Sequence, residues 1–124
     1  MGFLAGLYKV TVPELPVAAV VVDGVDATVE PGYLHRISGS DSDVTLTIAP
    51  LSLDAAANKR FAVKVYLTTA TAAGTLTILA PAGQTIEADS GELGDGVELD
   101  QALGTYREWV CDAEGHWLLV GGGW

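Results

Sequence analysis

Short segments in which apolar and polar residues alternate constrain the fold of this chain more than any other feature. Four such segments are rich in β-branched residues, and they span residues 25–30, 43–48, 61–67 and 74–79. Alternation with a period of two places successive side chains on opposite faces of an extended strand. We therefore predict four half-buried strands. In the second segment we expect Val44, Leu46 and Ile48 to face the core, with Thr45 and Thr47 on the opposite face.

Clusters of turn-forming residues separate the strand-like segments. They occupy residues 23–24, 31–32, 38–43, 73–74, 81–83 and 91–96. Turns that recur about every ten residues are typical of all-β folds. We predict an antiparallel β-sandwich or a jelly-roll-like barrel. The expected organisation is an extended N-terminal arm (1–24), a β-sandwich domain (25–120) and a Gly-rich tail (121–124).

Only residues 51–59 have a helical composition. Pro50 precedes them and Asn58 lies near their end, so the expected helix is limited to about two turns.

Near the C-terminus of the chain, two strand-like segments, 105–111 and 116–120, flank the sequence Asp-Ala-Glu-Gly at positions 112 to 115. Since glycine tolerates positive φ, this spacing predicts a β-hairpin.

The charge balance excludes one class of partner. The 124 residues include 16 acidic and 6 basic ones, which gives a formal net charge of −10. Nucleic-acid binding depends on Lys and Arg at the phosphates, so we expect no nucleic-acid partner.

The longest early apolar run, Val17 to Val22, is far shorter than the roughly 20 residues that a bilayer requires, and we expect neither a membrane span nor a signal peptide. The single cysteine cannot form an internal disulfide.

Cys111 and His116 flank the predicted turn, an arrangement in which a base could activate a thiol nucleophile. Catalysis also needs an orienting group and an oxyanion donor, and the other histidine, His35, lies in a different segment. Trp109 and Cys111 are two residues apart in one strand, so sharing an inward face is the favoured interpretation. We expect no catalytic residues and no enzymatic activity.

Acidic residues without any basic residue are concentrated in one segment. They are Glu87, Asp89, Glu92, Asp95, Glu98 and Asp100. Such a composition could hold a cation, but the ligand spacing of an EF-hand is absent. We therefore favour a solvated loop, or an acidic surface offered to a basic partner. Asp41 and Asp43 are interpreted as turn-capping residues. No metal and no other cofactor is expected.

The aromatic residues admit two interpretations. Those considered are Trp109, Trp117, Trp124, Tyr8, Tyr33, Tyr66 and Tyr106. They could form a platform on which sugars stack, but packing in a core or at a subunit interface is favoured, since Trp and Tyr are enriched in both. Trp124 follows three glycines, so we expect it to be either a C-terminal anchor in a neighbouring subunit or a disordered end.

Four motifs follow one another along the chain: a Thr-rich strand with an apolar turn and proline, a Lys-Arg strand, a Gly-x-Leu-Thr-Ile strand, and a strand followed by Asp-x-x-Gly-x-Trp and three apolar residues. They occupy residues 44–50, 58–65, 74–86 and 110–120. Their order, over about three quarters of the chain, resembles a β-rich module of tailed-bacteriophage virion proteins, found in tail fibres and capsid-attached proteins. The resemblance implies an all-β module that is often homotrimeric and has no catalytic residues.

From this resemblance we expect a capsid decoration (cement) protein that binds and stabilises the assembled capsid as a homotrimer. Its location would be the capsid surface of the virion, after assembly in the bacterial host cytoplasm. Only about 24 residues precede the module, which favours a small free-standing component over a fibre tip. Phe3, Leu4, Leu7 and Tyr8 of the apolar arm are the expected contacts with the major capsid protein. The alternative is a receptor- or carbohydrate-binding module of a tail fibre or tail tip.

Overall fold

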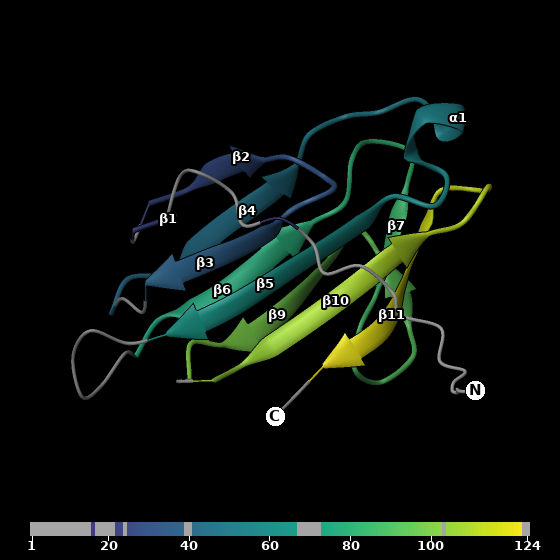
Figure 1. The fold of residues 1–124 in the computed structure, drawn as a ribbon. Coiled ribbons are helices and arrows are strands. Elements are labelled where there is room, and N and C mark those ends of the chain that lie inside the picture. The colour runs from purple at the N-terminus through teal and green to yellow at the C-terminus, as the bar shows by residue number, and fades with distance from the viewer. Residues whose placement is uncertain are drawn as a thin grey trace, which may run out of the picture.

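The computed structural model describes residues 16, 22–23, 25–38, 41–66, 73–102 and 104–122, which form strands in two mixed sheets and one short helix (Figure 1). The seven-stranded sheet has the order β1 (Val22–Asp23), β3 (Leu34–Ser38), β5 (Arg60–Tyr66), β10 (Tyr106–Cys111), β11 (His116–Gly122), β7 (Thr85–Glu87), β8 (Leu93–Gly94). The four-stranded sheet has the order β2 (Ala27–Val29), β4 (Val44–Ile48), β6 (Thr75–Leu79), β9 (Gly96–Asp100). The fold is therefore all-β, as the alternation predicts.

The direction of the strands differs from the expectation. Five of the nine strand pairs in the described residues are parallel, so the prediction of antiparallel sheets is wrong. From β2 to β6, each strand is followed by one in the other sheet. Each time the chain comes back to the same sheet, it runs in the same direction as before. As a result, β2, β4 and β6 are parallel neighbours, and so are β3 and β5. A local turn signal shows where the chain bends, but it does not show to which sheet the chain passes.

The predicted strand segments are confirmed in position. Residues 25–30, 43–48 and 74–79 contain β2, β4 and β6, residues 61–67 overlap β5, which begins one residue earlier, and the predicted hairpin is β10 and β11. Gly115 in its turn has φ of +86°, the left-handed conformation that favours glycine. Gly121 and Gly122, which were assigned to the tail, continue β11, and Val22 and Asp23, which were assigned to the arm, pair with β3.

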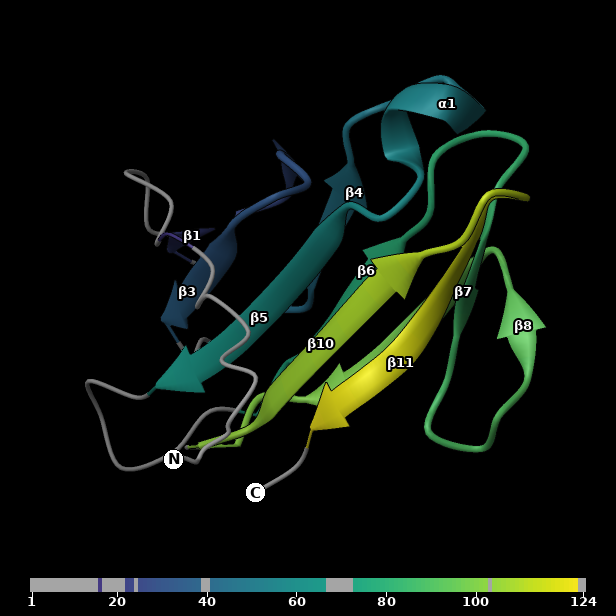
Figure 2. The same ribbon diagram turned by 45° about the vertical axis from the view of Figure 1, so that its right-hand side comes forward.

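Besides β1, four strands lie outside the predicted strand segments. In β3 the inward positions are taken by His35 and Ile37, so a histidine interrupts the apolar pattern. β7, β8 and β9 all lie within or beside the acidic segment, for which a solvated loop or an acidic surface offered to a basic partner is expected. The loop interpretation is wrong for β9, because Val97 and Leu99 face the core while its acidic residues face outward. Its alternation covers only residues 97–100, the shortest length at which alternation indicates a strand. Figure 2 shows β7 between β11 and β8 at the edge of the sheet.

The single helix of the described residues, α1 (Leu53–Ala56), is shorter than the two turns expected from residues 51–59. Ser52 caps its N-terminus, with its hydroxyl accepting a hydrogen bond from the N–H of Ala55 at 3.2 Å. Asn58, at φ of +66°, leads the chain out of the helix and into β5. The helix ends early because Ala57, with φ of −55° and ψ of 129°, has already left the helical conformation.

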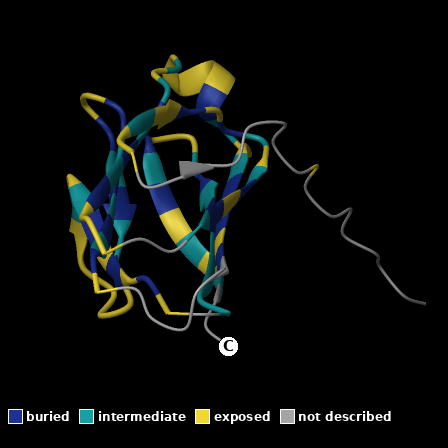
Figure 3. Ribbon diagram, turned by 90° about the vertical axis from the view of Figure 1, so that its left-hand side faces the viewer, coloured by how far each residue is buried: buried dark blue, intermediate teal, exposed yellow. Residues whose placement is uncertain are grey.

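Both sheets contribute to one core. Their buried apolar side chains include Ile37, Phe61, Val63, Val65, Ile86, Trp109, Cys111 and Trp117 from the seven-stranded sheet, and Val29, Val44, Leu46, Ile48, Leu76, Ile78, Val97 and Leu99 from the four-stranded sheet. Buried and more exposed positions alternate along the strands, so each sheet has an inner and an outer face (Figure 3). Burial of this many apolar side chains is the main stabilising contribution.

Candidate functional site

The residues predicted to contact a partner, Phe3, Leu4, Leu7 and Tyr8 of the arm and Trp124 at the C-terminus, lie outside the described residues. The surfaces that the structure does describe are the β10–β11 hairpin and the outer faces of the two sheets. We consider each of them from its residues upward.

Cys111 and His116 are not brought together as a nucleophile and a base. The thiol of Cys111 is buried in the core and donates to the backbone oxygen of Asp112 at 3.4 Å. Burial, followed by the neighbouring Asp112 carboxylate, raises the pKa of the Cys111 thiol. The imidazole of His116 instead contacts Asp112, with 3.0 Å between Nδ1 and Oδ2. A thiol with a raised pKa is a poor nucleophile at neutral pH.

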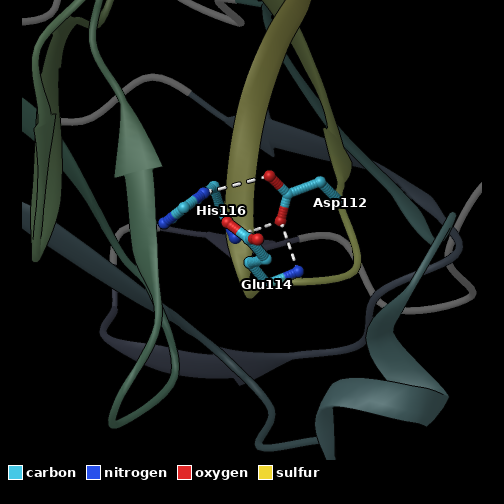
Figure 4. Close-up of side chains that lie close together, drawn as sticks. All are labelled: Asp112, Glu114 and His116. Carbon is cyan, nitrogen blue, oxygen red and sulfur yellow. Dashed lines mark hydrogen bonds and ion pairs between the residues drawn. The ribbon is translucent and has the colours of Figure 1, made fainter.

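The hairpin turn gathers three polar side chains, those of Asp112, Glu114 and His116 (Figure 4). Each offers one ligand atom, and these atoms lie within 4.8 Å of one another. Asp112 Oδ1 accepts hydrogen bonds from the backbone N–H groups of Glu114, at 2.8 Å, and His116, at 2.9 Å. The N–H of His116 is the main cause that holds the pKa of Asp112 below its usual value. These contacts are those of an aspartate that caps a turn.

Two of the three tryptophans are buried in the core and are not available to stack on a sugar. Trp109 Nε1 donates to the backbone oxygen of Glu87 at 2.9 Å, and Trp117 Nε1 donates to Oε1 of Gln84 at 2.8 Å. Both indole N–H groups are therefore satisfied, as buried tryptophans require. The favoured interpretation of these two residues as packing residues agrees with their positions.

The outer face of the four-stranded sheet is a regular polar surface, which we call the threonine face. Strand register arranges its residues in three rows across the sheet. The rows are Asp43, Thr75 and Asp100; Asp26, Thr45, Thr77 and Glu98; and Thr28, Thr47, Leu79 and Gly96. Neighbouring strands lie about 4.8 Å apart, so the threonines form a close-spaced array with acidic residues at its borders.

Two aspartates fix the N-terminal ends of these strands in equivalent ways. Asp26, just before β2, accepts a hydrogen bond at Oδ1 from the N–H of Thr45 at 2.8 Å. Asp43, just before β4, accepts at Oδ1 from the N–H of Thr75 at 2.9 Å and from its hydroxyl at 3.2 Å. Each carboxylate thus joins the start of one strand to the next parallel strand.

A shallow groove of about 320 Å³ opens on the threonine face between β2 and β4. Its lining residues are Asp26, Ala27, Thr28, Thr45 and Thr47. The groove therefore combines one carboxylate with three hydroxyl groups. Hydroxyls both donate and accept hydrogen bonds, whereas the ionised carboxylate only accepts them.

The basic residues of the described chain are confined to one of the two sheets, whereas acidic residues occur in both. The described Lys and Arg residues are Arg36, Lys59, Arg60, Lys64 and Arg107, all in or directly beside β3, β5 and β10. β2, β4, β6 and β9 contain none, and four acidic residues belong to the threonine face. The threonine face therefore has a negative potential, while most of the positive charge belongs to the opposite sheet.

The outer face of the seven-stranded sheet differs from the threonine face because it exposes apolar side chains near its C-terminal strand. Val120 is 58% exposed and Leu118 is 36% exposed, and both belong to β11. Val110 of β10 pairs with Leu118 and is half-buried. These three side chains, the hairpin patch, project from regular strands, so their positions are fixed before any partner binds.

Glu87 completes the hydrogen bonding of β11 where its pairing with β7 ends. β7 pairs with only the first two residues of β11, His116 and Trp117. Beyond them, the N–H of Leu119 donates to the Glu87 carboxylate at 2.8 Å. A side chain therefore takes the position of a strand partner, which protects a sheet edge against unwanted pairing.

Comparison with known proteins gives no match: no family model, no curated protein and no solved structure is similar to the chain at a significant level. Within the described part of the chain, no helix has the length and apolar character needed to cross a bilayer.

Sequence reasoning missed the groove and the role of Glu87. The alternation of Thr45 and Thr47 predicts an outward polar face, but Asp26 comes next to it only through the parallel pairing of β2 and β4. Glu87 was grouped with the acidic segment, and no local pattern indicates that its carboxylate accepts the N–H of a residue 32 positions later.

Proposed function

We propose that the chain is a structural protein of a tailed-bacteriophage virion: a capsid decoration (cement) protein that binds the assembled capsid as a homotrimer and stabilises it without catalysis. In this proposal the two sheets are the layers of a β-sandwich or jelly-roll-like barrel. The arm that precedes β1 contacts the major capsid protein through Phe3, Leu4, Leu7 and Tyr8, whereas Val22 and Asp23 belong to the sheet. The protein is located on the capsid surface.

The observation that supports this proposal most directly is the hairpin patch. The motif resemblance ends in Asp-x-x-Gly-x-Trp followed by three apolar residues, here Leu118, Leu119 and Val120. Two of these three side chains are exposed on a regular strand. Rigid, exposed apolar side chains favour binding to another protein surface, because little conformational entropy is lost on contact. A ligand that binds only the assembled shell stabilises it by mass action.

The test is to mix the full-length protein with expanded and unexpanded capsids of the phage that encodes it and to measure co-sedimentation. We expect preferential binding to expanded capsids. Light scattering should give a solution mass three times the 12.8 kDa of one chain. A monomeric mass would contradict the trimer, and failure to bind either capsid form would contradict capsid decoration.

Two variants distinguish the contribution of the arm to capsid binding from that of the hairpin patch. Deletion of residues 1–12 should abolish capsid binding, and retained binding would show that the arm assignment is wrong. Val120→Thr should weaken binding by up to about tenfold, since it places a hydroxyl in an apolar contact. Val25→Thr is the matched control, because Val25 is 63% exposed and lies outside the hairpin patch. Equal affinities of the two variants would exclude the hairpin patch from the interface.

A further inference from the structure

We propose that the threonine face is a docking surface for a basic protein surface, and that the groove between β2 and β4 receives one arginine side chain beside Asp26. This inference concerns a different surface from the arm and the hairpin patch. It holds or fails independently of capsid binding, because its test needs only the isolated protein.

Charge defines the partner. Four acidic residues lie in the rows of the threonine face, which are Asp26, Asp43, Glu98 and Asp100, and no Lys or Arg occurs in its strands. The basic residues of the described chain lie in and beside the opposite sheet, where Arg60 pairs with Glu108 and Arg107 pairs with Asp89. A basic surface of another protein is therefore attracted to this face, and surfaces of negative charge are repelled from it.

Asp26 provides a specific acceptor within the groove. Its Oδ1 accepts the N–H of Thr45, which fixes the orientation of the carboxylate. Among the described residues, its Oδ2 has no hydrogen-bond partner. Asp26 is exposed, so the carboxylate is accessible and a bound cation can approach it without disturbing the strand pairing.

The shape and chemistry of the groove favour a guanidinium group. Thr28, Thr45 and Thr47, on two neighbouring strands, supply hydroxyl acceptors to the same groove as the carboxylate. Arginine presents five N–H donors in one rigid plane and so can donate to a carboxylate and to hydroxyls together, whereas the lysine ammonium is a compact point charge. Threonine side chains have few rotamers, so the acceptors are largely ordered before binding.

The test is a titration of the ¹⁵N-labelled full-length protein with the acetylated and amidated peptide (Arg-Gly)₃ at low ionic strength. We expect NMR shift changes concentrated at residues 26–28 and 45–47, and a loss of binding as salt is raised. The same peptide with citrulline in place of arginine has the same shape without charge and should not bind. Shift changes spread evenly over all acidic surfaces, or equal binding of the citrulline peptide, would overturn the proposal.

Variants with the same change in charge locate the site. Asp26→Asn should weaken peptide binding about three- to fivefold, while its amide oxygen can still accept the N–H of Thr45. Asp54→Asn, in α1 and outside the threonine face, is the matched control and should leave the affinity nearly unchanged. Thr47→Val should weaken binding without loss of charge.

Equal effects of Asp26→Asn and Asp54→Asn on peptide affinity would mean that the peptide is held only by the overall negative charge, and would refute a groove-specific site. Equal affinity for a (Lys-Gly)₃ peptide would overturn the preference for arginine.

Discussion

Among the glycines that the structure describes, Gly74 has the least room for a side chain. A Cβ at this position would lie 2.0 Å from the backbone oxygen of Ser42 and 2.4 Å from its carbonyl carbon. The side chain of Gln101 reinforces this contact by donating to the oxygens of Ser42, at 3.0 Å, and Thr75, at 3.1 Å. The absence of a Cβ at Gly74 therefore permits the loop before β4 to pack against the start of β6.

We predict that Gly74→Ala lowers the free energy of unfolding by about 3 kcal/mol or more, since backbone must move to relieve the overlap. Gly83→Ala is the control: its φ is +80° but nothing lies within 4 Å of the added Cβ, so it should cost only about 1–2 kcal/mol. Urea denaturation measures both. Equal losses of stability would show that the Ser42 contact can relax.

At the scale of elements, β11 is held by two different kinds of partner. β10 pairs with it along most of its length, with an irregularity between Glu108 and Trp109, whereas β7 pairs with only two residues. The Glu87 carboxylate replaces the missing strand at Leu119. The hairpin patch is on the same strand, so the order of this edge affects the proposed capsid contact.

We predict that Glu87→Ala increases the rate of hydrogen exchange at the Leu119 amide by about tenfold or more, because a hydrogen bond to a charged acceptor contributes about 1.5–3 kcal/mol. Exchange at the buried β4 amides should change much less. Glu92→Ala removes an exposed carboxylate from the same acidic segment and should leave Leu119 unaffected. Unchanged protection in Glu87→Ala would mean that the side-chain contact does not hold this edge.

For the whole molecule, one buried histidine contributes to the response of stability to pH near neutrality. His35 is 2% exposed, its ring packs against Phe61 with 4.8 Å between centroids, and Nδ1 lies 3.3 Å from the backbone oxygen of Ala62. Burial is the main cause that lowers the pKa of His35 below the ordinary 6.5. The contacts with backbone oxygens and the charge of Glu30 raise the pKa, but their sum is smaller.

Because the folded state binds this proton less readily than the unfolded state, we predict that stability falls as pH decreases below about 6.5. One proton gives a slope of at most about 1.4 kcal/mol per pH unit. Thermal or urea unfolding between pH 7.5 and 5 measures the slope. His35→Phe should flatten the profile in this range, even if the variant differs in absolute stability. An unchanged slope in His35→Phe would assign the pH dependence to other groups.

The sequence by itself determined six of the strands, β2, β4, β5, β6, β10 and β11, and for β4 it also determined which face is buried. Val44, Leu46 and Ile48 lie inside and Thr45 and Thr47 outside, as the alternation predicts, because the period of two is a property of the extended chain itself. The β-hairpin with its turn at positions 112 to 115 could also be predicted, because its turn residues and flanking strands are adjacent in the sequence.

Only the tertiary structure decided the direction and order of the strands, the inward position of His35 and the composition of the threonine face. The groove combines Asp26 with Thr45 and Thr47 through the register of two strands separated by another strand in the opposite sheet. Its partner residues are about twenty positions apart. Pairing over such distances is selected by the packing of the whole core, and no short stretch of sequence contains that information.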